Sequence, residues 1–483
     1  MAMATLQFSR RRVLAAAGVL PLIGAALGAC AAAPSASTTA SLASSATTAT
    51  RSSVAAATSR AASSAIPLPA TVPPAAGAIT LTWGGEDTLA NIKSQTAEVD
   101  AFNKQQSAIH VNYLPVTNIL GAIPTKLQTM IAGGVAPDFF QLSSSYYASA
   151  VGKGVFLDLT AYVNQSTSFH TDDFFPVVWN AYLYHNRIFA IPREGAPTAT
   201  FYNADMYQQA GIAPPPGTLK DAAAWTTDAF LEAATRLTRT AGGSTSVYGY
   251  AAPQGAWAPF LFSFGGDVLD SSLTKCVLDS PAAITAFTWL QDTLYKQQVA
   301  PQPAEAAKLA PDKRFEAAGL AMVLDKRFSG GEFGQTIHNF SWKLAPFPAG
   351  PAGRISDMTS NAVAVWAQTK HPAEAFQAAD FMESTAGHLL RMQLAPQIGV
   401  PQRKSVVESS QFLNDEMPPT ENQLIIDQIA TSRFFPPMTP VWPDVSAAIG
   451  KAMTTLWQNK GTPHDVLTAL VPQVNALLAG QGS

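Results

Sequence analysis

The stretch ITLTWGG, from Ile79 to Gly85, alternates apolar and polar residues and ends in two glycines. Such alternation is typical of a β-strand with one buried face, and a glycine pair is typical of the turn that follows. Helix-length segments separate it from further strand-like runs at 109–114 and 139–142. Strands separated by helices predict α/β units with parallel pairing. Because ligands bind beyond the carboxyl ends of parallel strands, we expect 84–88 and 143–147 to share a binding edge.

The length of the chain predicts two lobes. Of 483 residues, roughly 400 follow an Ala/Ser/Thr/Pro-rich segment, and a single core stops growing near about 250–300 residues. The formal net charge is −3, and no clustered basic face of the kind that binds nucleic acid is present in the sequence. The two cysteines are Cys30 and Cys276, and the second lies in an apolar run that predicts a buried, unpaired thiol.

The N-terminal residues have the features of an export and lipidation signal. SRRRVL, Ser9 to Leu14, matches the twin-arginine pattern, and an apolar run with several glycines continues to Ala29. Such a run predicts a cleaved secretory signal over 1–29 rather than a transmembrane span. LGAC, Leu27 to Cys30, resembles a bacterial lipobox, in which the cysteine receives a lipid; the alternative is an apolar start with one chance cysteine. Residues 30–77 would then be a lipidated Cys30 and a disordered linker, since 31–77 contains no aromatic residue.

Several motifs in the rest of the chain resemble one family in both content and order. They are Lys126–Gly134 followed by Ala136–Asp138, FYNADMY at Phe201–Tyr207, Trp257–Phe260 with Gly265–Gly266, Gly319–Met322, Ala345–Pro348, His371–Ala375 and Pro440–Pro443. From Ile79 onward the chain is therefore identified as similar to the family 1 extracellular solute-binding proteins, which are receptors of ABC importers and include maltose-binding protein. Ala204 and Phe328 depart from the lysine and tryptophan that this family usually has there, and Phe328 weakens any inference about sugar preference.

The resemblance implies an α/β fold of the two-lobed, type II periplasmic-binding-protein class. Each lobe would be a sheet flanked by helices, and three segments would cross between lobes near 190–197, 354–360 and 399–403. The N-terminal lobe would comprise 78–191 plus 356–398, and the C-terminal lobe 196–352 plus 404–483. Two such lobes close around a ligand.

A sugar-binding site combines an aromatic platform with carboxylates, amides and arginine. Strand ends, crossings and family motifs supply the candidate ligand-binding residues, which are Trp83, Glu86, Asp87, Ser143, Ser144, Ser145, Tyr146, Arg193, Glu194, Trp257, Phe328, Asn361 and Trp442.

Each candidate also has a purely structural alternative. Trp83 and Trp257 could be core aromatics, and the adjacent carboxylates after Trp83 could be solvated loop residues. The serines could cap the next helix, Arg193 and Glu194 could form a structural ion pair at a crossing, and Asn361 could serve in a turn.

A receptor for import has two alternatives, a carbohydrate-acting enzyme and a surface receptor or sensor. A carbohydrate-acting enzyme would need paired carboxylates at a catalytic separation, and the sequence has no G-x-S-x-G, H-E-x-x-H, P-loop or dinucleotide-binding glycine motif. A surface receptor or sensor on the same scaffold leaves no distinguishing motif.

The sequence therefore predicts a monomeric, non-enzymatic receptor without cofactor or metal, lipid-anchored outside the cytoplasm. It would deliver a sugar or oligosaccharide to an ABC permease.

Overall fold

The computed structural model describes residues 72–252, 256–394, 399–414 and 419–480. The predicted signal peptide, Cys30 and most of the predicted linker lie outside the described residues. Strands β1 (Ile79–Gly85), β2 (Ile109–Pro115) and β3 (Phe139–Ser143) are parallel, with β1 between the other two. Helices α1 (Leu89–Gln105) and α2 (Thr125–Ala132) connect them in sequence. The α/β units predicted from the ITLTWGG stretch and its neighbours are confirmed.

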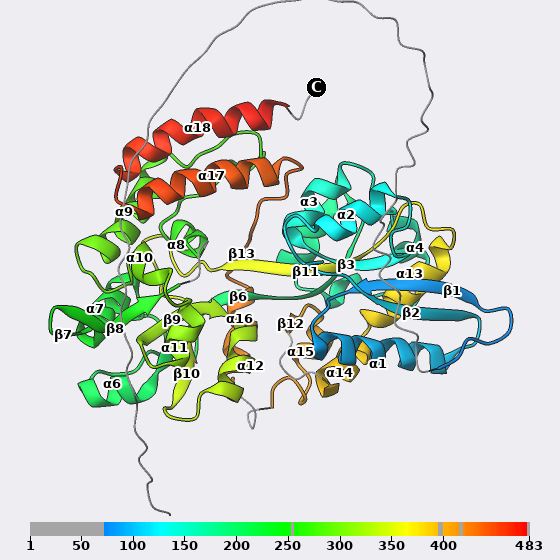
Figure 1. Cartoon of the computed structure of the whole chain (residues 1–483), viewed down its shortest axis with the longest axis horizontal. Coiled ribbons are helices and arrows are strands. Elements are labelled where there is room, and N and C mark those ends of the chain that lie inside the picture. Colours follow the sequence, from blue (N-terminus) through cyan, green and yellow to red (C-terminus); the bar gives the residue numbers. More distant parts are fainter. Residues whose placement is uncertain (1–71, 253–255, 395–398, 415–418, 481–483) are drawn as a thin grey trace, which may run out of the picture. The chain divides into compact units, whose positions relative to one another are not determined.

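The sheet continues through two long antiparallel strands, β6 (Ile191–Asn203) and β11 (Asp357–Val365). The end of β11 pairs with β3. Residues 198–202 of β6 pair with the antiparallel strand β9 (Leu320–Lys326). Strand β8 (Ser244–Ala251) pairs with β9 in parallel, and β7 (Arg239–Ala241) pairs with the other edge of β8. Strand β10 (Trp342–Ala345) also pairs with β6. Strand β6 therefore belongs to both halves of the sheet (Figure 1).

The β1–β3 part of the sheet, with the helices that pack on it, forms the first lobe. Its core includes Leu81, Val111, Phe139 and Val363. Its other elements are α3 (Ser144–Val151), α4 (Thr160–Gln165), a 3-10 turn at Thr171–Asp173, α5 (Pro176–Trp179), a second 3-10 turn at Asn180–Tyr182, β4 (Leu183–Tyr184), β5 (Arg187–Ile188), α13 (Pro372–Met382) and α14 (Thr385–Leu394).

The β7–β10 part of the sheet belongs to the second lobe. Its core includes Phe230, Phe260, Phe287 and Met322, together with the buried, free Cys276. Its helices are α6 (Ala204–Ala210), α7 (Thr227–Leu237), α8 (Ala258–Ser263), α9 (Pro281–Tyr295), α10 (Pro303–Ala306), α11 (Pro311–Glu316), α12 (Arg327–Thr336), α16 (Asn422–Ile429), α17 (Trp442–Trp457) and α18 (Pro463–Ala479).

Short strands strengthen the region where the lobes join. Strand β12 (Val400–Pro401) pairs with β6 and leads to α15 (Lys404–Val407), while β13 (Arg433–Phe434) pairs with β11. The three segments predicted to cross between lobes contain parts of β6 and β11 and the whole of β12, so all three are joined by strand pairing here. Within the described residues, no helix is long and apolar enough to cross a membrane.

Candidate functional site

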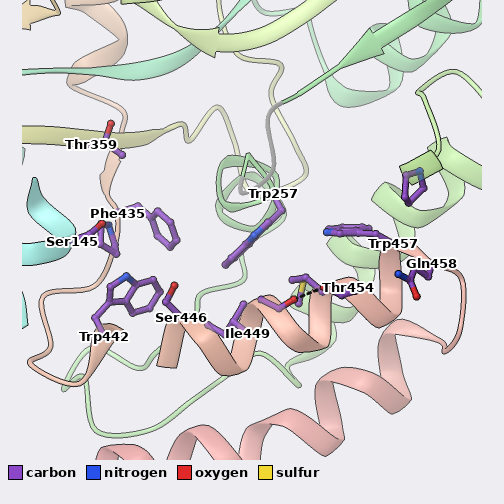
Figure 2. Close-up of a pocket in the computed structure, with 14 residues that line it drawn as sticks. Ser145, Trp257, Thr359, Phe435, Trp442, Ser446, Ile449, Thr454, Trp457 and Gln458 are labelled. Carbon is purple, nitrogen blue, oxygen red and sulfur yellow. Dashed lines mark hydrogen bonds between the residues drawn. The ribbon is translucent and has the colours of Figure 1, made fainter. Parts of the chain in front are cut away.

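Two hollows lie where the lobes meet, and Thr359 of β11 lines both. We name them the aromatic hollow and the acidic hollow, and we call the pair the cleft. The aromatic hollow has a volume of about 480 Å³ and is lined by Ser145, Trp257, Pro303, Thr359, Phe435, Pro436, Trp442, Ser446, Ile449, Gly450, Met453, Thr454, Trp457 and Gln458 (Figure 2).

The acidic hollow is the larger, at about 680 Å³. It is lined by Glu86, Ala90, Asn91, Leu120, Glu194, Gly195, Ala196, Phe328, Gln335, Thr359, Ser360, Asn361, Leu394 and Gly399. Residues from the start of α1 and from α12 contribute to the same hollow, so both lobes supply its walls.

Helix α17 builds one wall of the aromatic hollow. Trp442, Ser446, Ile449, Met453 and Trp457 recur every three or four residues, which places them on one face of an α-helix. Figure 2 shows this face turned toward the rest of the hollow. Trp442, Ile449 and Met453 are largely buried in the core of the second lobe, so the stripe presents only small parts of these side chains to the hollow.

An aromatic cluster fixes Trp257 and Trp442. The ring of Phe435 lies 5.6 Å from that of Trp257 and 5.5 Å from that of Trp442, both edge-to-face, and Trp257 also packs at 5.5 Å on Phe287. Edge-to-face aromatic pairs contribute roughly 0.5–1.5 kcal/mol beyond the area they bury. The cluster therefore holds the rings in place before any ligand is bound. None of the described residues that line this hollow is charged.

The acidic hollow is chemically different because two carboxylates line it. Burial raises the pKa of Glu86 to about 7, and the nearby charge of Glu194 adds to the effect. Asn91 lies in the first turn of α1, whose N-cap Thr88 accepts a hydrogen bond from the Asn91 backbone N–H at 3.2 Å. Asn361 and Gln335 add amide groups to the lining. The hollow can thus accept and donate several hydrogen bonds.

A buried ionic network lies against this hollow. The guanidinium of Arg193 donates to Glu383 and, at 3.1 Å, to Glu98, and all three side chains are fully buried. His388 lies 3.2 Å from Glu383, and burial together with the charge of Arg391 lowers the pKa of His388 to about 4. Although burial alone would raise it, the charge of Arg193 holds the pKa of Glu383 at about 2. The network therefore fixes the start of β6 to α1 and to the α13–α14 corner.

The structure brings part of the predicted site together. Glu86, Glu194, Phe328 and Asn361 line the acidic hollow, whereas Ser145, Trp257 and Trp442 line the aromatic hollow. Phe328 is 54% exposed, so its ring is available for contact with a ligand.

The remaining predicted residues lie elsewhere. Trp83 is fully buried, stacked on Phe139 at 5.9 Å and covered by Arg193, and thus belongs to the core of the first lobe. Ser143 caps α3 by accepting a hydrogen bond from the Tyr146 backbone N–H. Ser144 and Tyr146 are buried, and Asp87 is exposed and outside both hollows. For Trp83 and Ser143, the structural alternatives predicted from the sequence describe their placement. Arg193 forms a structural ion pair, but with Glu98 and Glu383 rather than with Glu194.

Sequence reasoning missed several lining residues. The spacing from Trp442 to Trp457 would place these side chains on one face of a helix, but nothing in the sequence indicates that this face borders a cleft. No sequence pattern indicated that Phe435 would line the hollow, because it lies in an irregular segment after β13. Among the described residues, no group of His, Cys, Asp and Glu is arranged to hold a metal ion.

The protein therefore has the two-lobed, type II periplasmic-binding-protein fold, with a ligand-sized cleft between its α/β lobes. The sequence model for bacterial extracellular solute-binding proteins matches residues 88–388, more than half of the chain. The chain belongs to that family, and the resemblance stated from its motifs is confirmed.

Individual relatives are distant. A curated protein of Brucella abortus (strain 2308), named as a binding protein, is 22% identical over 392 residues, which cover 78% of this chain and 88% of the Brucella protein.

Among solved structures, an ABC substrate-binding protein of Listeria monocytogenes in complex with cycloalternan has a TM-score of 0.72 and 23% identity, covering 83% of this chain and 99% of that one. A solute-binding protein of Thermotoga lettingae bound with α-D-tagatose has a TM-score of 0.69 and 20% identity, covering 83% and 100%.

Proposed function

We propose that this protein is the lipid-anchored receptor of an ABC importer and captures a sugar or oligosaccharide in the cleft. The observation that carries the proposal is the division of the cleft into an aromatic half and a half lined by carboxylates and amides, joined at Thr359. The carbohydrate complexes of its structural neighbours in Listeria and Thermotoga support the same class of ligand.

A sugar has two kinds of surface, and each has a counterpart in the cleft. The C–H faces of a pyranose ring pack on aromatic rings, which Trp257 and Trp442 would supply. The hydroxyl groups need hydrogen-bond partners, and Glu86, Glu194 and Asn361 would provide them. A hydrogen bond to a charged group contributes roughly 1.5–3 kcal/mol net, so a few such bonds are sufficient for micromolar affinity.

Capture would involve closure of the two lobes. A ligand that contacts residues of both lobes binds the closed state more tightly than the open state, and therefore shifts the population toward closure. We place the lobes at 78–191 plus 356–398 and at 196–352 plus 404–483, with β6, β11 and β12 at the crossings. A closed receptor is the form that a permease would recognise.

The anchor is proposed from the sequence of the first thirty residues. Lipidation of Cys30 after cleavage at Ala29 would tether the receptor to the membrane, and 31–77 would give it reach. Cys30→Ser should move the protein from the membrane fraction to the soluble fraction. An unchanged distribution would contradict lipid anchoring.

Thermal unfolding in the presence of mono- and oligosaccharides tests the function. A ligand at a hundred times its Kd stabilises the folded state by about 2.7 kcal/mol, which raises the melting temperature by several degrees. We expect such a shift with one class of sugar and none with amino acids or peptides. A panel in which no carbohydrate raises the melting temperature would contradict the proposal.

A further inference from the structure

A third hollow lies within the second lobe, and we name it the apolar groove. It has a volume of about 380 Å³, and its described lining runs from β8 and α8 through α9 to α10 and α11. This volume lies within the range of small-molecule pockets. Aliphatic side chains are common in the lining, among them Leu290 and Leu294 of α9 and Leu309 just before α11. The groove therefore offers mainly apolar surface to the molecule that fills it.

The groove offers few polar groups to a ligand. Tyr250 and Arg314 belong to its described lining, and both side chains are engaged within the protein. The Tyr250 hydroxyl lies 2.8 Å from the Thr293 hydroxyl, and the Nη2 atom of Arg314 donates to the Glu305 carbonyl oxygen at 2.7 Å. Sugar hydroxyl groups placed here would lose hydrogen bonds to water without gaining as many from the protein, and an apolar hollow also holds water poorly. The groove therefore favours an apolar occupant.

The groove borders the aromatic hollow, because Trp257, Pro303 and Trp457 line both. Trp442 and Trp457 are the first and last residues of the 16-residue helix α17, and they lie roughly 22 Å apart along its axis. Figure 2 shows Thr359 on the Trp442 side of the hollow and Trp457 at the other end. The acidic hollow thus joins the aromatic hollow near the start of α17, and the apolar groove borders it near the end of α17.

The open side of the groove exposes apolar side chains to solvent. Leu309 is 38% exposed, and the neighbouring Ala307 and Ala310 are exposed and line the groove as well. The charged residues of this segment, Glu305 and Lys308, pair with each other at 2.6 Å and do not belong to the described lining. Removal of apolar surface from water is favourable, so an apolar group that enters the groove would stabilise the complex.

We propose that the ligand is a sugar that carries an apolar substituent, such as an alkyl or aryl aglycone, and that the apolar groove binds this substituent while the cleft binds the sugar. The three surfaces follow one another in the order carboxylates and amides, aromatic rings, and aliphatic side chains. This order matches a molecule that is hydroxylated at one end and apolar at the other. Trp257 and Trp457 would contact the ligand where its two parts join. The inference rests on the proposed function and narrows its ligand class to glycosides with an apolar aglycone.

Matched glycosides provide the test. The methyl, n-hexyl and phenyl glycosides of glucose, galactose, mannose and maltose form sets that share the sugar and differ only in the substituent at C1. Affinities for the purified full chain would be measured by calorimetry, at concentrations below those at which the hexyl glycosides aggregate. Each buried methylene raises an affinity by roughly threefold to fourfold, and ordering of the chain offsets part of this gain. We therefore expect the hexyl or the phenyl glycoside in at least one set to bind about tenfold tighter than its methyl counterpart, or better.

Two variants assign the gain to the groove. In Leu309→Gln and in Leu294→Gln, a polar amide replaces an apolar side chain of the lining, so the affinity ratio of the extended glycoside to the methyl glycoside should fall about fivefold or more. Val135→Gln is the matched control, because Val135 is also an exposed apolar residue, at 64%, and lines neither the cleft nor the groove. The ratio should not change in this control.

The possible failures are distinguishable. If the methyl glycosides bind as tightly as their extended counterparts, or if free sugars bind and no glycoside does, the inference is overturned while the carbohydrate receptor stands. A ratio that falls equally in Val135→Gln, or in neither groove variant, would also overturn it. The substituent would then lie outside the groove, which would be left to a protein partner or to another part of this chain. If neither free sugars nor glycosides bind, the proposed function fails and the inference fails with it.

Discussion

At the scale of single residues, Trp257 combines two roles. Its ring packs on Phe287 and Phe435 within the second lobe, and it also lines the aromatic hollow. Removing it should therefore affect both the folded state and the ligand. Trp289 packs on Phe260 at 4.9 Å in the same lobe but lines neither hollow of the cleft, and so offers a comparison.

Trp257→Ala should weaken binding of the carbohydrate identified in the panel at least tenfold, because an aromatic face of the site is lost. It should also lower stability by ~3–5 kcal/mol, as deletion of a large core side chain does. Calorimetry below the melting temperature of the variant measures the first effect. Trp289→Ala should lower stability while leaving affinity unchanged, and equal affinities for the two variants would show that the aromatic platform is elsewhere.

Glu86 gives a prediction for pH. Its pKa of about 7 in the folded state lies above its ordinary value of 4.5, so the folded state binds the proton more tightly than the unfolded state does. The stability contributed in this way is complete below pH 4.5 and is lost as the pH rises through 7. Glu86→Gln should therefore be more stable than the wild type at pH 8, by roughly 1–2 kcal/mol after allowance for its partial exposure, with a smaller difference at pH 5. Urea unfolding of the ligand-free proteins checks this, and a difference that grows toward low pH would contradict it.

Trp83 shows why single residues of the site are hard to predict. Its position at the end of an alternating strand is compatible with the rim of a binding edge and with the core equally well. Leu81 and Trp83 share one face of β1 and both are fully buried, and the Trp83 ring packs on Phe139 and lies under the guanidinium of Arg193. The partner that buries Trp83 comes from β6, more than a hundred residues later, and no local pattern contains that information.

At the scale of elements, local signals were the most dependable. Ser280-Pro281 and Thr462-Pro463 have residue types that typically begin a helix, and the Ser280 and Thr462 hydroxyls do accept hydrogen bonds from the backbone N–H groups of Ala283 in α9 and Asp465 in α18. A proline inside a helix usually kinks or splits it, yet α18 continues through Pro472 to Ala479. Packing against α17 and α9 compensates for the hydrogen bond that proline removes. The length of β6 was not predicted, because its two halves pair with different strands. Residues 191–197 pair with β11, and residues 198–202 pair with β9.

Gly195 is the position at which β6, β11 and β12 approach one another most closely. It pairs with Ser360 of β11 on one side and Val400 of β12 on the other. A Cβ atom there would lie 2.0 Å from the Thr359 carbonyl oxygen, which is backbone and has no freedom to move aside.

Gly195→Ala should destabilise the protein by about 1–3 kcal/mol or more, since the strands would have to separate locally. It should also weaken ligand binding, because Thr359 and Ser360 line the cleft. Gly217→Ala, where a Cβ atom would contact nothing, is the control and should be close to neutral. Denaturant unfolding of both variants makes the comparison, and equal stability of Gly195→Ala and wild type would show that the crossing tolerates a side chain.

At the scale of the whole molecule, the fold class could be predicted from the order of motifs along the chain, and the family match confirms it. The division of the cleft into an aromatic and an acidic hollow could not be predicted, since it depends on which faces of α17, α1 and α12 meet across the lobes. Seven predicted residues line the cleft, namely Glu86, Ser145, Glu194, Trp257, Phe328, Asn361 and Trp442, and most of them lie where strands end or lobes cross. The positions where strands end and lobes cross follow from the topology of the sheet. Which side chains face the cleft at those positions depends on packing between residues far apart in the sequence.

We propose that a carbohydrate binds between the lobes and closes them. Small-angle X-ray scattering, recorded with and without a saturating sugar whose binding calorimetry has established, tests it most directly. Closure predicts a smaller radius of gyration in the complex than in the free protein, and no change with a sugar that does not bind. An identical radius in the free and the fully bound protein would contradict it.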